Sequence, residues 1–256
     1  MSGDHKRAEA LGAHAVQISF IIGSVVLWYL ATTRWGVSRI LLPNPVAVWD
    51  ALGQVLSTGE YIADLRVTLG ELAAAFAISA VGGVAAGYLI SRSSWRIRVF
   101  EPLLASIYAV PLILFLPLYI LWFGLGPPSK IALGATISFF PIVLSTIAGF
   151  GNVDRTLVTA AKSMGASDYQ LFRYVLVPAA LPVILSGLRM GFTIALLAII
   201  GSEVIASLAG LGHHIVQLAE GMDMARMFAY IAFVVVIAAL LNSAVSFLEA
   251  RGRRRI

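Results

Sequence analysis

The sequence contains no cysteine and few charged residues. Without cysteine there can be no disulfide bonds and no thiolate metal site, and the redox compartment cannot be read from the sequence. Only 12% of the 256 residues are charged and 59% are hydrophobic, whereas a soluble domain carries about a quarter charged residues. One core cannot hide this much apolar surface, so the composition predicts a protein whose solvent is lipid.

Sequence motifs of catalysis and nucleotide binding are also missing. There is no HExxH zinc helix, no GxSxG nucleophile elbow and no GxxxxGK[ST] phosphate loop. His213 and His214 are adjacent, so they cannot both face one ion from a helix, and no acid lies at ligand spacing from them. We therefore expect no catalytic residue, cofactor site or metal site in this chain, and any energy source must be a separate subunit.

Six apolar segments are long enough to cross a membrane, which takes about 20 residues. We expect an all-α, polytopic membrane protein, because helices pair every backbone group inside lipid and no alternating strands of a membrane barrel are present. Lys6 and Arg7 would suit a signal peptide, but no small-residue cleavage site follows, so we expect a retained first span. With no repeat or linker, we treat 1–256 as one transmembrane domain with spans at about 15–33, 67–90, 102–123, 131–150, 183–208 and 227–248.

The positive charges are distributed unequally between the two sets of connections. One set, which includes both termini, holds twelve Lys and Arg residues and the other holds five. Cytoplasmic loops carry the excess, so both termini are expected in the cytoplasm. The basic tail RGRRRI suits an anionic lipid surface, and we expect no nucleic-acid partner.

Two further patterns indicate how the spans pack. Gly83 and Gly87 form a small-xxx-small pair, which favours close contact between helices in a membrane. In the external loop 34–66, Asn44 is expected to cap a helix that begins at Pro45. Its apolar positions predict one stripe lying on the membrane surface, made of Val46, Val48, Trp49, Leu52, Val55 and Leu56.

A polar island, TAAKSMGASDYQLFRYVLVP, interrupts the apolar chain on the cytoplasmic side. A first helix is expected over 156–164 and to end at Gly165, which tolerates left-handed φ. Ser167 and Gln170 have capping-box spacing, which predicts a second helix that runs to about Leu176 and is stopped by Pro178. The pattern indicates a rigid knob between two helices, either an ordinary surface helix pair or a docking surface for a soluble protein.

The spacing Ala160-Ala161, three residues, Gly165, nine residues, Val175-x-Val177-Pro178 resembles the EAA loop of permease subunits of ATP-binding-cassette importers. Thr159 stands where the family often has glutamate. The resemblance extends over most of the chain. LLPNPVAVWDAL, PLILFLPLYILWFGLGPPSKIAL and GSEVIASLAGLG are similar to the branch that serves nitrate, sulfonate, taurine and related small anions or organic solutes.

This resemblance implies a type I importer permease fold in the bacterial inner membrane. It implies two ATPase subunits that bind ATP and Mg²⁺, a second and identical permease subunit, and a soluble or lipid-anchored substrate-binding protein. The coupling segment would be 156–178. Its expected ATPase-coupling residues are Ala160, Ala161, Met164, Gly165, Ala166 and Ser167.

Two charged residues stand inside the fifth predicted span. Glu203 is interpreted as the only acid well within a span; it either pairs with a polar group or backbone N–H near Gly201 or Gly210, or serves gating or lines the solute pathway. Arg189 lies near the cytoplasmic start of that span, where snorkelling of its side chain would explain it.

Two other classes of function stay open. A secondary transporter or channel without an ATPase partner would usually place several ionisable groups near the midplane of the membrane. An intramembrane enzyme would need a nucleophile or metal signature, which is missing. A permease subunit of an importer is the function that the sequence favours, whereas the transported solute cannot be read from it.

Overall fold

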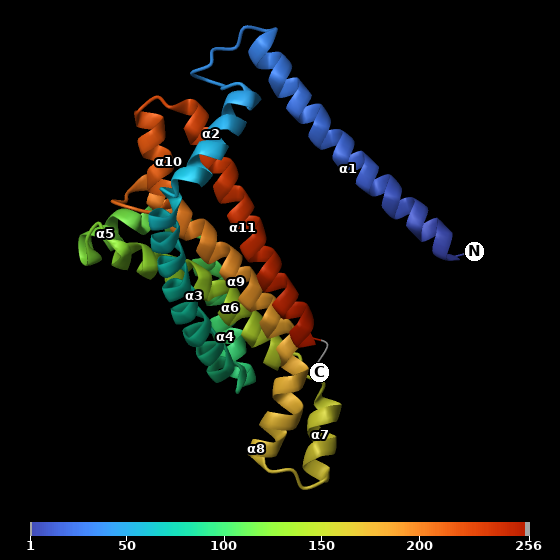
Figure 1. Ribbon diagram of the computed structural model, residues 1–256. Coiled ribbons are helices and arrows are strands. Elements are labelled where there is room, and N and C mark those ends of the chain that lie inside the picture. The colour runs from blue at the N-terminus through green and yellow to red at the C-terminus, as the bar shows by residue number, and fades with distance from the viewer. Residues whose placement is uncertain (1, 254–256) are drawn as a thin grey trace. The chain divides into compact units, whose positions relative to one another are not determined.

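The structure is a computed structural model that describes the backbone of residues 2–253 and the side chains of residues 16, 17 and 19–252. The described residues are largely helical and contain no strand (Figure 1). In chain order the α-helices are α1 Ser2–Thr33, α2 Pro45–Thr58, α3 Tyr61–Ser91, α4 Ser94–Tyr108, α5 Leu116–Phe123, α6 Pro127–Gly151, α7 Arg155–Ser163, α8 Asp168–Leu171, α9 Val177–Ile205, α10 Leu211–Glu220 and α11 Met224–Arg253. The expected all-α class is confirmed.

The chain forms two compact units. The first contains the residues up to 61 together with 215–233, and the second contains 62–214 together with the residues from 234 on. In the first unit, Val48 and Ala51 of α2 are buried against Ala229 of α11, and Trp28 of α1 packs at the same cluster. Three segments distant in sequence therefore share one small core.

Helix α2 begins as expected, because the Asn44 side chain accepts a hydrogen bond from the Val46 amide at 2.9 Å and Pro45 occupies the first turn. Part of the expected apolar stripe packs inside the protein. Val48 and Val55 are buried, whereas Val46 and Trp49 are exposed, as is Leu56. The apolar residues of α2 therefore divide into a face that packs on α1 and α11 and a face that is uncovered in the single chain.

In the second unit, α3 and α9 both pack closely on α6. A Cβ atom at Gly83 would lie 2.8 Å from Ile142 Cγ2, and one at Gly87 would lie 2.5 Å from Thr146 Cβ. Gly191 of α9 approaches Ile142 in the same way. Glycine therefore lets three backbones meet closely, which is how helices associate where lipid offers no hydrophobic driving force.

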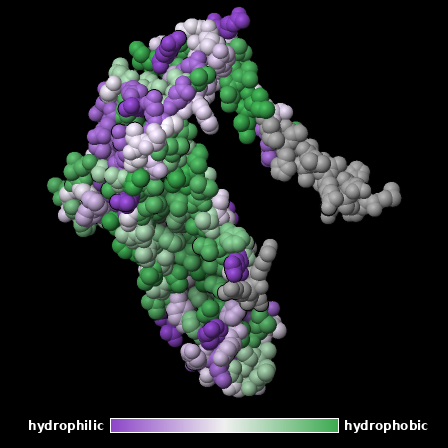
Figure 2. All heavy atoms as spheres, viewed as in Figure 1, coloured by the Kyte–Doolittle hydropathy of each residue, from purple (hydrophilic) through white to green (hydrophobic). Residues whose placement is uncertain are grey.

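Four of the helical segments, 61–91, 127–151, 168–205 and 224–252, are long and apolar enough to span a membrane. In α1, the apolar stretch among residues with described side chains is the shorter Ser19–Thr33, and part of the first predicted span lies outside them. Figure 2 shows hydrophobic residues over the middle of the second unit's helices and hydrophilic patches around α7 and α8.

The third predicted span, 102–123, is not one continuous helix. Helix α4 ends at Tyr108, a 3₁₀ turn covers Leu112–Phe115, and the segments on either side of the break form an angle of 74°. The break falls at Pro111, and Pro117 lies in the first turn of α5. Proline supplies no N–H to an upstream carbonyl, so it interrupts a helix but fits its first turn. The bent pair counts as a fifth span if it crosses as one unit.

Candidate functional site

The polar island forms a rigid elbow made of α7, the turn 164–167 and α8 (Figure 1). Helix α7 runs from Arg155 to Ser163, close to the expected bounds. Its N-cap is Asp154, whose side chain accepts a hydrogen bond from the Thr156 amide at 2.8 Å, and this bond lowers the pKa of the Asp154 carboxyl below its usual value. The helix start is therefore fixed by a charge-assisted bond that the sequence analysis did not identify.

The turn of the elbow has the backbone that the sequence predicts. Gly165 has a φ of +80°, and a Cβ there would meet nothing within 4 Å, so the conformation and not the space calls for glycine. The Gly165 amide donates to the Lys162 carbonyl at 3.0 Å and the Ala166 amide donates to the Ala161 carbonyl at 3.0 Å. These bonds close the carbonyl end of α7.

The expected capping box is present. The Gln170 amide donates to Ser167 Oγ at 3.3 Å, and the Ser167 amide donates to Gln170 Oε1 at 2.8 Å. All of these bonds span only a few residues along the chain. The elbow is therefore held by its own backbone and caps, which makes it stiff without contacts from elsewhere.

The second helix does not stop at Pro178, so that expectation is wrong. After α8 the chain makes a π-helical turn, Phe172–Leu176, and continues directly into α9, with Pro178 in its first turn. The Val177 amide donates to the Phe172 carbonyl, one residue farther back than in an α-helix. The proline therefore opens the span and does not end the elbow, and α8 is continuous with a membrane helix.

The tip of the elbow is apolar and uncovered. Met164 is 86% exposed, and Leu157, Tyr169 and Tyr174 are exposed as well. A groove of about 530 Å³ runs between the two arms. Five of the six expected coupling residues line this groove: Ala160, Ala161, Met164, Gly165 and Ala166. The sixth, Ser167, is exposed beside the groove. An apolar surface on the most polar part of the chain is the type of feature that a protein partner covers.

Three aromatic rings join the elbow to the membrane helices. The Phe172 ring lies 4.9 Å from that of Tyr88 on α3 and 6.3 Å from that of Phe150 on α6, and the Tyr88 and Phe150 rings are 5.2 Å apart. The sequence analysis missed this cluster, because its members are far apart in the chain. Through these rings the elbow contacts α3 and α6, in addition to its direct continuation into α9.

A second site surrounds Glu203 near the end of α9, where the carboxylate is 1% exposed. Thr68 Oγ1 on α3 donates to Glu203 Oε1 at 2.7 Å, and the Gly212 amide donates to Oε2 at 2.8 Å. The Leu211 amide in turn donates to Thr68 Oγ1 at 3.0 Å. Glu203 thus has the partners expected of a structural role, a polar group and a backbone N–H just past Gly210.

The chain leaves α9 at Ala206 and folds back over Glu203 at close range. Gly210 has a φ of +108°, and a Cβ there would collide with the Glu203 carboxylate; a Cβ at Gly212 would lie 2.6 Å from the Ile200 carbonyl oxygen. Asp64 of α3 holds the same turn, since it accepts from the Gly210 amide at 3.3 Å and lies 3.2 Å from His214 Nδ1. The carboxylates tie the break between α9 and α10 to α3.

Glu203 is not the only acid well inside a span, and that expectation is wrong. Glu71 lies within α3 with its side chain 2% exposed, and Lys130, which the charge count assigned to an external loop, is equally buried 3.6 Å from it. The Lys130 ammonium also donates to the Gly126 carbonyl at 3.2 Å. Glu249 of α11 is a third buried acid, 9% exposed. The sequence hid Glu71 and Lys130 because both lie at the edges of apolar segments.

Arg189 does not simply snorkel to the surface. Its Nη1 lies 3.3 Å from Glu249 Oε2, and Ser186 donates to Glu249 Oε1 at 3.1 Å. One turn farther along α9, Thr193 donates to Asn242 Oδ1 at 2.7 Å. A polar seam therefore joins α9 and α11.

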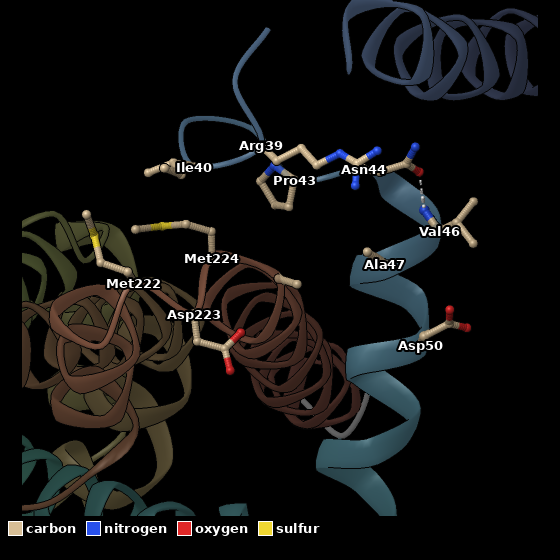
Figure 3. Close-up of a pocket in the computed structure, with 11 residues that line it drawn as sticks. Arg39, Ile40, Pro43, Asn44, Val46, Ala47, Asp50, Met222, Asp223 and Met224 are labelled. Carbon is tan, nitrogen blue, oxygen red and sulfur yellow. Dashed lines mark hydrogen bonds between the residues drawn. The ribbon is translucent and has the colours of Figure 1, made fainter. Parts of the chain in front are cut away.

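A cavity of about 560 Å³ lies in the first unit. Arg39 and Asn44 line it from the loop before α2 and Asp50 from α2 itself, while Met222 lines it from the turn before α11 and Met224 from the first residue of α11 (Figure 3). Its lining combines single charges with apolar side chains. Among the described residues, no three His, Asp or Glu side chains lie close enough to hold a metal ion.

Comparison with known proteins gives one family match over most of the chain. Residues 47–254 match the family described as binding-protein-dependent transport system inner membrane component. The chain is 32% identical to the riboflavin transport system permease protein of Chloroflexus aurantiacus over 88% of its own length and 84% of the relative. It is 31% identical to a putative aliphatic sulfonates transport permease protein of Bacillus subtilis, over 89% and 82%, and 29% identical to the taurine transport system permease protein of Escherichia coli, over 92% and 89%.

Solved structures support the fold. An amino acid ABC transporter matches with a TM-score of 0.63 at 24% identity, covering 80% of this chain and 98% of that one. The inward-facing MetNI methionine ABC transporter matches with a TM-score of 0.65 at 17% identity, covering 78% and 97%. The family match contains the elbow, the Glu203 site and the glycine-packed helices. The chain therefore belongs to the inner membrane components of binding-protein-dependent transport systems, the permease subunits that carry solute across the membrane.

Proposed function

We propose that this permease belongs to an ATP-binding-cassette importer for small sulfonate-like organic anions and is driven through its elbow by a separate ATPase. The observation that carries this proposal is the uncovered apolar tip at 164–166 on a stiff elbow that is continuous with a membrane helix. A stiff element passes on displacement, whereas a flexible loop would absorb it. Two ATPase subunits would bind ATP and Mg²⁺ and supply the displacement.

The coupling residues have distinct roles in this proposal. Met164, the most exposed of them, enters the ATPase surface, and Ala160 and Ala161 are small enough to let that surface approach α7. Gly165 sets the turn, while Ala166 and Ser167 start the second arm. The Phe172 cluster then passes the movement to α3 and α6.

The sulfonate class rests on the relatives named for taurine and aliphatic sulfonates. Taurine is itself an aminosulfonate, so two of the relatives share one charged group. The relative named for riboflavin carries a different chemistry at similar identity. Riboflavin is therefore the competing solute in the test below.

The charge distribution and the family support the proposed orientation and subunit assembly. We propose that the elbow and both termini face the cytoplasm, because their side of the chain holds twelve of the Lys and Arg residues against five. A substrate-binding protein, soluble or lipid-anchored, would deliver solute on the other face. A second, identical permease would complete the pathway.

Glu203 takes a gating role in this proposal without touching solute. It is buried and hydrogen-bonded, so it does not line a pathway in this conformation. Instead it anchors the turn 206–212 to α3. Movement of α3 and α9 would open or close that end of the bundle through this anchor.

The direct test reconstitutes the permease with a candidate ATPase and a candidate substrate-binding protein, and measures uptake of taurine and of riboflavin. We expect ATP-dependent taurine uptake and no uptake without the ATPase. Since the chain has no cysteine, Met164→Cys can be crosslinked to the ATPase, with the exposed Met222→Cys as the matched control. Uptake driven by an ion gradient alone, or crosslinking at residue 222 and not at 164, would contradict the proposal.

A further inference from the structure

Helix α9 carries a polar stripe inside an apolar span. Ser186, Arg189 and Thr193 recur at three- and four-residue spacing and so share one face of the helix. Glu249 and Asn242 of α11 contact this stripe, through the bonds described above. Arg189 lies about 18 Å along α9 from Val177, from the helical rise per residue. The stripe therefore begins in the half of α9 nearest the elbow.

The two charges of this seam are presented very differently. The Arg189 side chain is 52% exposed, whereas that of Glu249 is 9% exposed. Ser186, Arg189, Met190, Thr193, Ile194 and Glu249 line an open cavity of about 500 Å³. Among the described residues, the Arg189 guanidinium, which has five N–H donors, contacts the Glu249 carboxylate through Nη1. The half-exposed Arg189 guanidinium therefore faces the cavity with N–H donors, while the Glu249 carboxylate is buried.

A half-exposed guanidinium inside a span cannot face hydrocarbon at low cost. Charged residues there face a water-filled cavity or the interior of a bundle, and they mark solute paths. Glu249 draws this guanidinium sideways toward α11, so it is not simply reaching along α9 for the membrane surface. The next polar contact, Thr193 with Asn242, lies deeper still.

We propose that the stripe of Ser186, Arg189 and Thr193 lines the half of the solute pathway nearest the elbow, and that Arg189 selects for anionic groups such as sulfonate. Glu249 is a positioning residue that fixes the guanidinium with its donors toward the cavity. This inference rests on the proposed function, because it requires the spans to enclose a pathway. It adds the residues that recognise the anion and the part of the pathway where they act.

The test uses the lack of cysteine in the native chain. Met190→Cys places a thiol in the cavity next to Arg189, and Leu240→Cys places one at an exposed apolar position on α11 outside the cavity. Both are labelled in membranes with water-soluble methanethiosulfonates that carry either a sulfonate or a trimethylammonium group. The ratio of the two rates is compared with the ratio for a free thiol.

We expect the thiol at 190 to react and the thiol at 240 to stay unlabelled. An unpaired unit charge about 8 Å away in water-like surroundings would change the relative rate of the two reagents about fivefold in favour of the sulfonate. The Glu249 carboxylate offsets part of the Arg189 charge, so we expect a smaller preference of the same sign. Arg189→Gln should abolish this preference and Arg189→Lys should retain it. If Arg189→Gln fails to fold because Glu249 loses its cation, Arg189→Gln with Glu249→Gln removes both charges and should also abolish the preference.

Labelling does not depend on the ATPase, so it separates this inference from the proposed function. An unreactive thiol at 190 would show that the stripe is not in water and would overturn the inference even if ATP-dependent uptake is present. Equal labelling by the two reagents, or a preference unchanged by Arg189→Gln, would overturn the selection of anions.

Discussion

The elbow and the Glu203 site differ in how far apart in the sequence their bonded residues lie. The elbow is stiff although its surroundings are open, because bonds between residues a few positions apart hold its turn and both arms. The Glu203 site is buried, and its bonds join α9 and the following turn to α3, which is distant in the sequence. Local bonds make a part that can be pushed without changing shape, whereas long-range bonds make one that responds when helices move.

Because its bonds join separate helices, substitutions in the Glu203 site should destabilise the bundle. Glu203→Ala leaves the Gly212 amide and the Thr68 hydroxyl without their acceptor and removes two bonds to a carboxylate, so we expect a loss of about 3 kcal/mol. Thermal unfolding in detergent measures it. Glu203→Gln keeps an acceptor and should lose about half as much; equal losses would contradict this expectation and show that an amide oxygen cannot replace the carboxylate.

The next largest loss of stability is expected where the turn 206–212 lies close to α9. Gly212→Ala places a Cβ about where the Ile200 carbonyl and Glu203 Cβ already lie, and overpacking of this kind costs about 2 kcal/mol. Gly201→Ala is the matched control, because a Cβ there meets nothing within 4 Å and alanine favours a helix by up to about 1 kcal/mol. Stability equal to wild type in Gly212→Ala would contradict the tight packing of this turn.

The same division explains what could be read from the sequence. The capping box of Ser167 and Gln170 and the left-handed Gly165 were predicted because the residues that make each feature lie within a few positions. Glu71 and Lys130 were not, since a buried pair formed by separate helices leaves no local pattern. The close packing at Gly83 and Gly87 was predicted correctly, because small residues at helical spacing favour close contact between membrane helices.

Pro178 shows where local reasoning fails. Proline ends a helix when it falls inside one and fits when it falls in the first turn. The sequence does not say which applies, because the π-helical turn that separates α8 from α9 has no residue signature of its own. The break at Pro111 lies inside the predicted span 102–123 in the same way, because apolar composition does not show whether a proline kinks a helix or ends it.

On the elbow, substitutions should uncouple transport and leave the bundle stable. Gly165→Val forces a β-branched residue to a φ of +80°, which costs about 1–3 kcal/mol locally and distorts the turn. We expect ATP-dependent uptake to fall about tenfold, the effect of about 1.4 kcal/mol on a rate, with the unfolding temperature of the spans unchanged. Gly165→Asn tolerates the left-handed region and is the control. Parallel loss of uptake and of stability would show that the elbow is a structural part of the bundle.

The smallest effect is expected where only one end of the elbow is loosened. Ser167→Ala removes the acceptor for the Gln170 amide but leaves the Ser167 amide bonded to Gln170 Oε1, so the second arm should lose about 1 kcal/mol of local stability. Hydrogen exchange of residues 168–172 should speed up about fivefold, as that free energy implies, while exchange around Glu203 stays as in wild type. Uptake should fall less than in Gly165→Val, because α8 remains continuous with α9 and Phe172 still packs on Tyr88. A change in exchange at both regions would mean that the local and long-range parts are not separable.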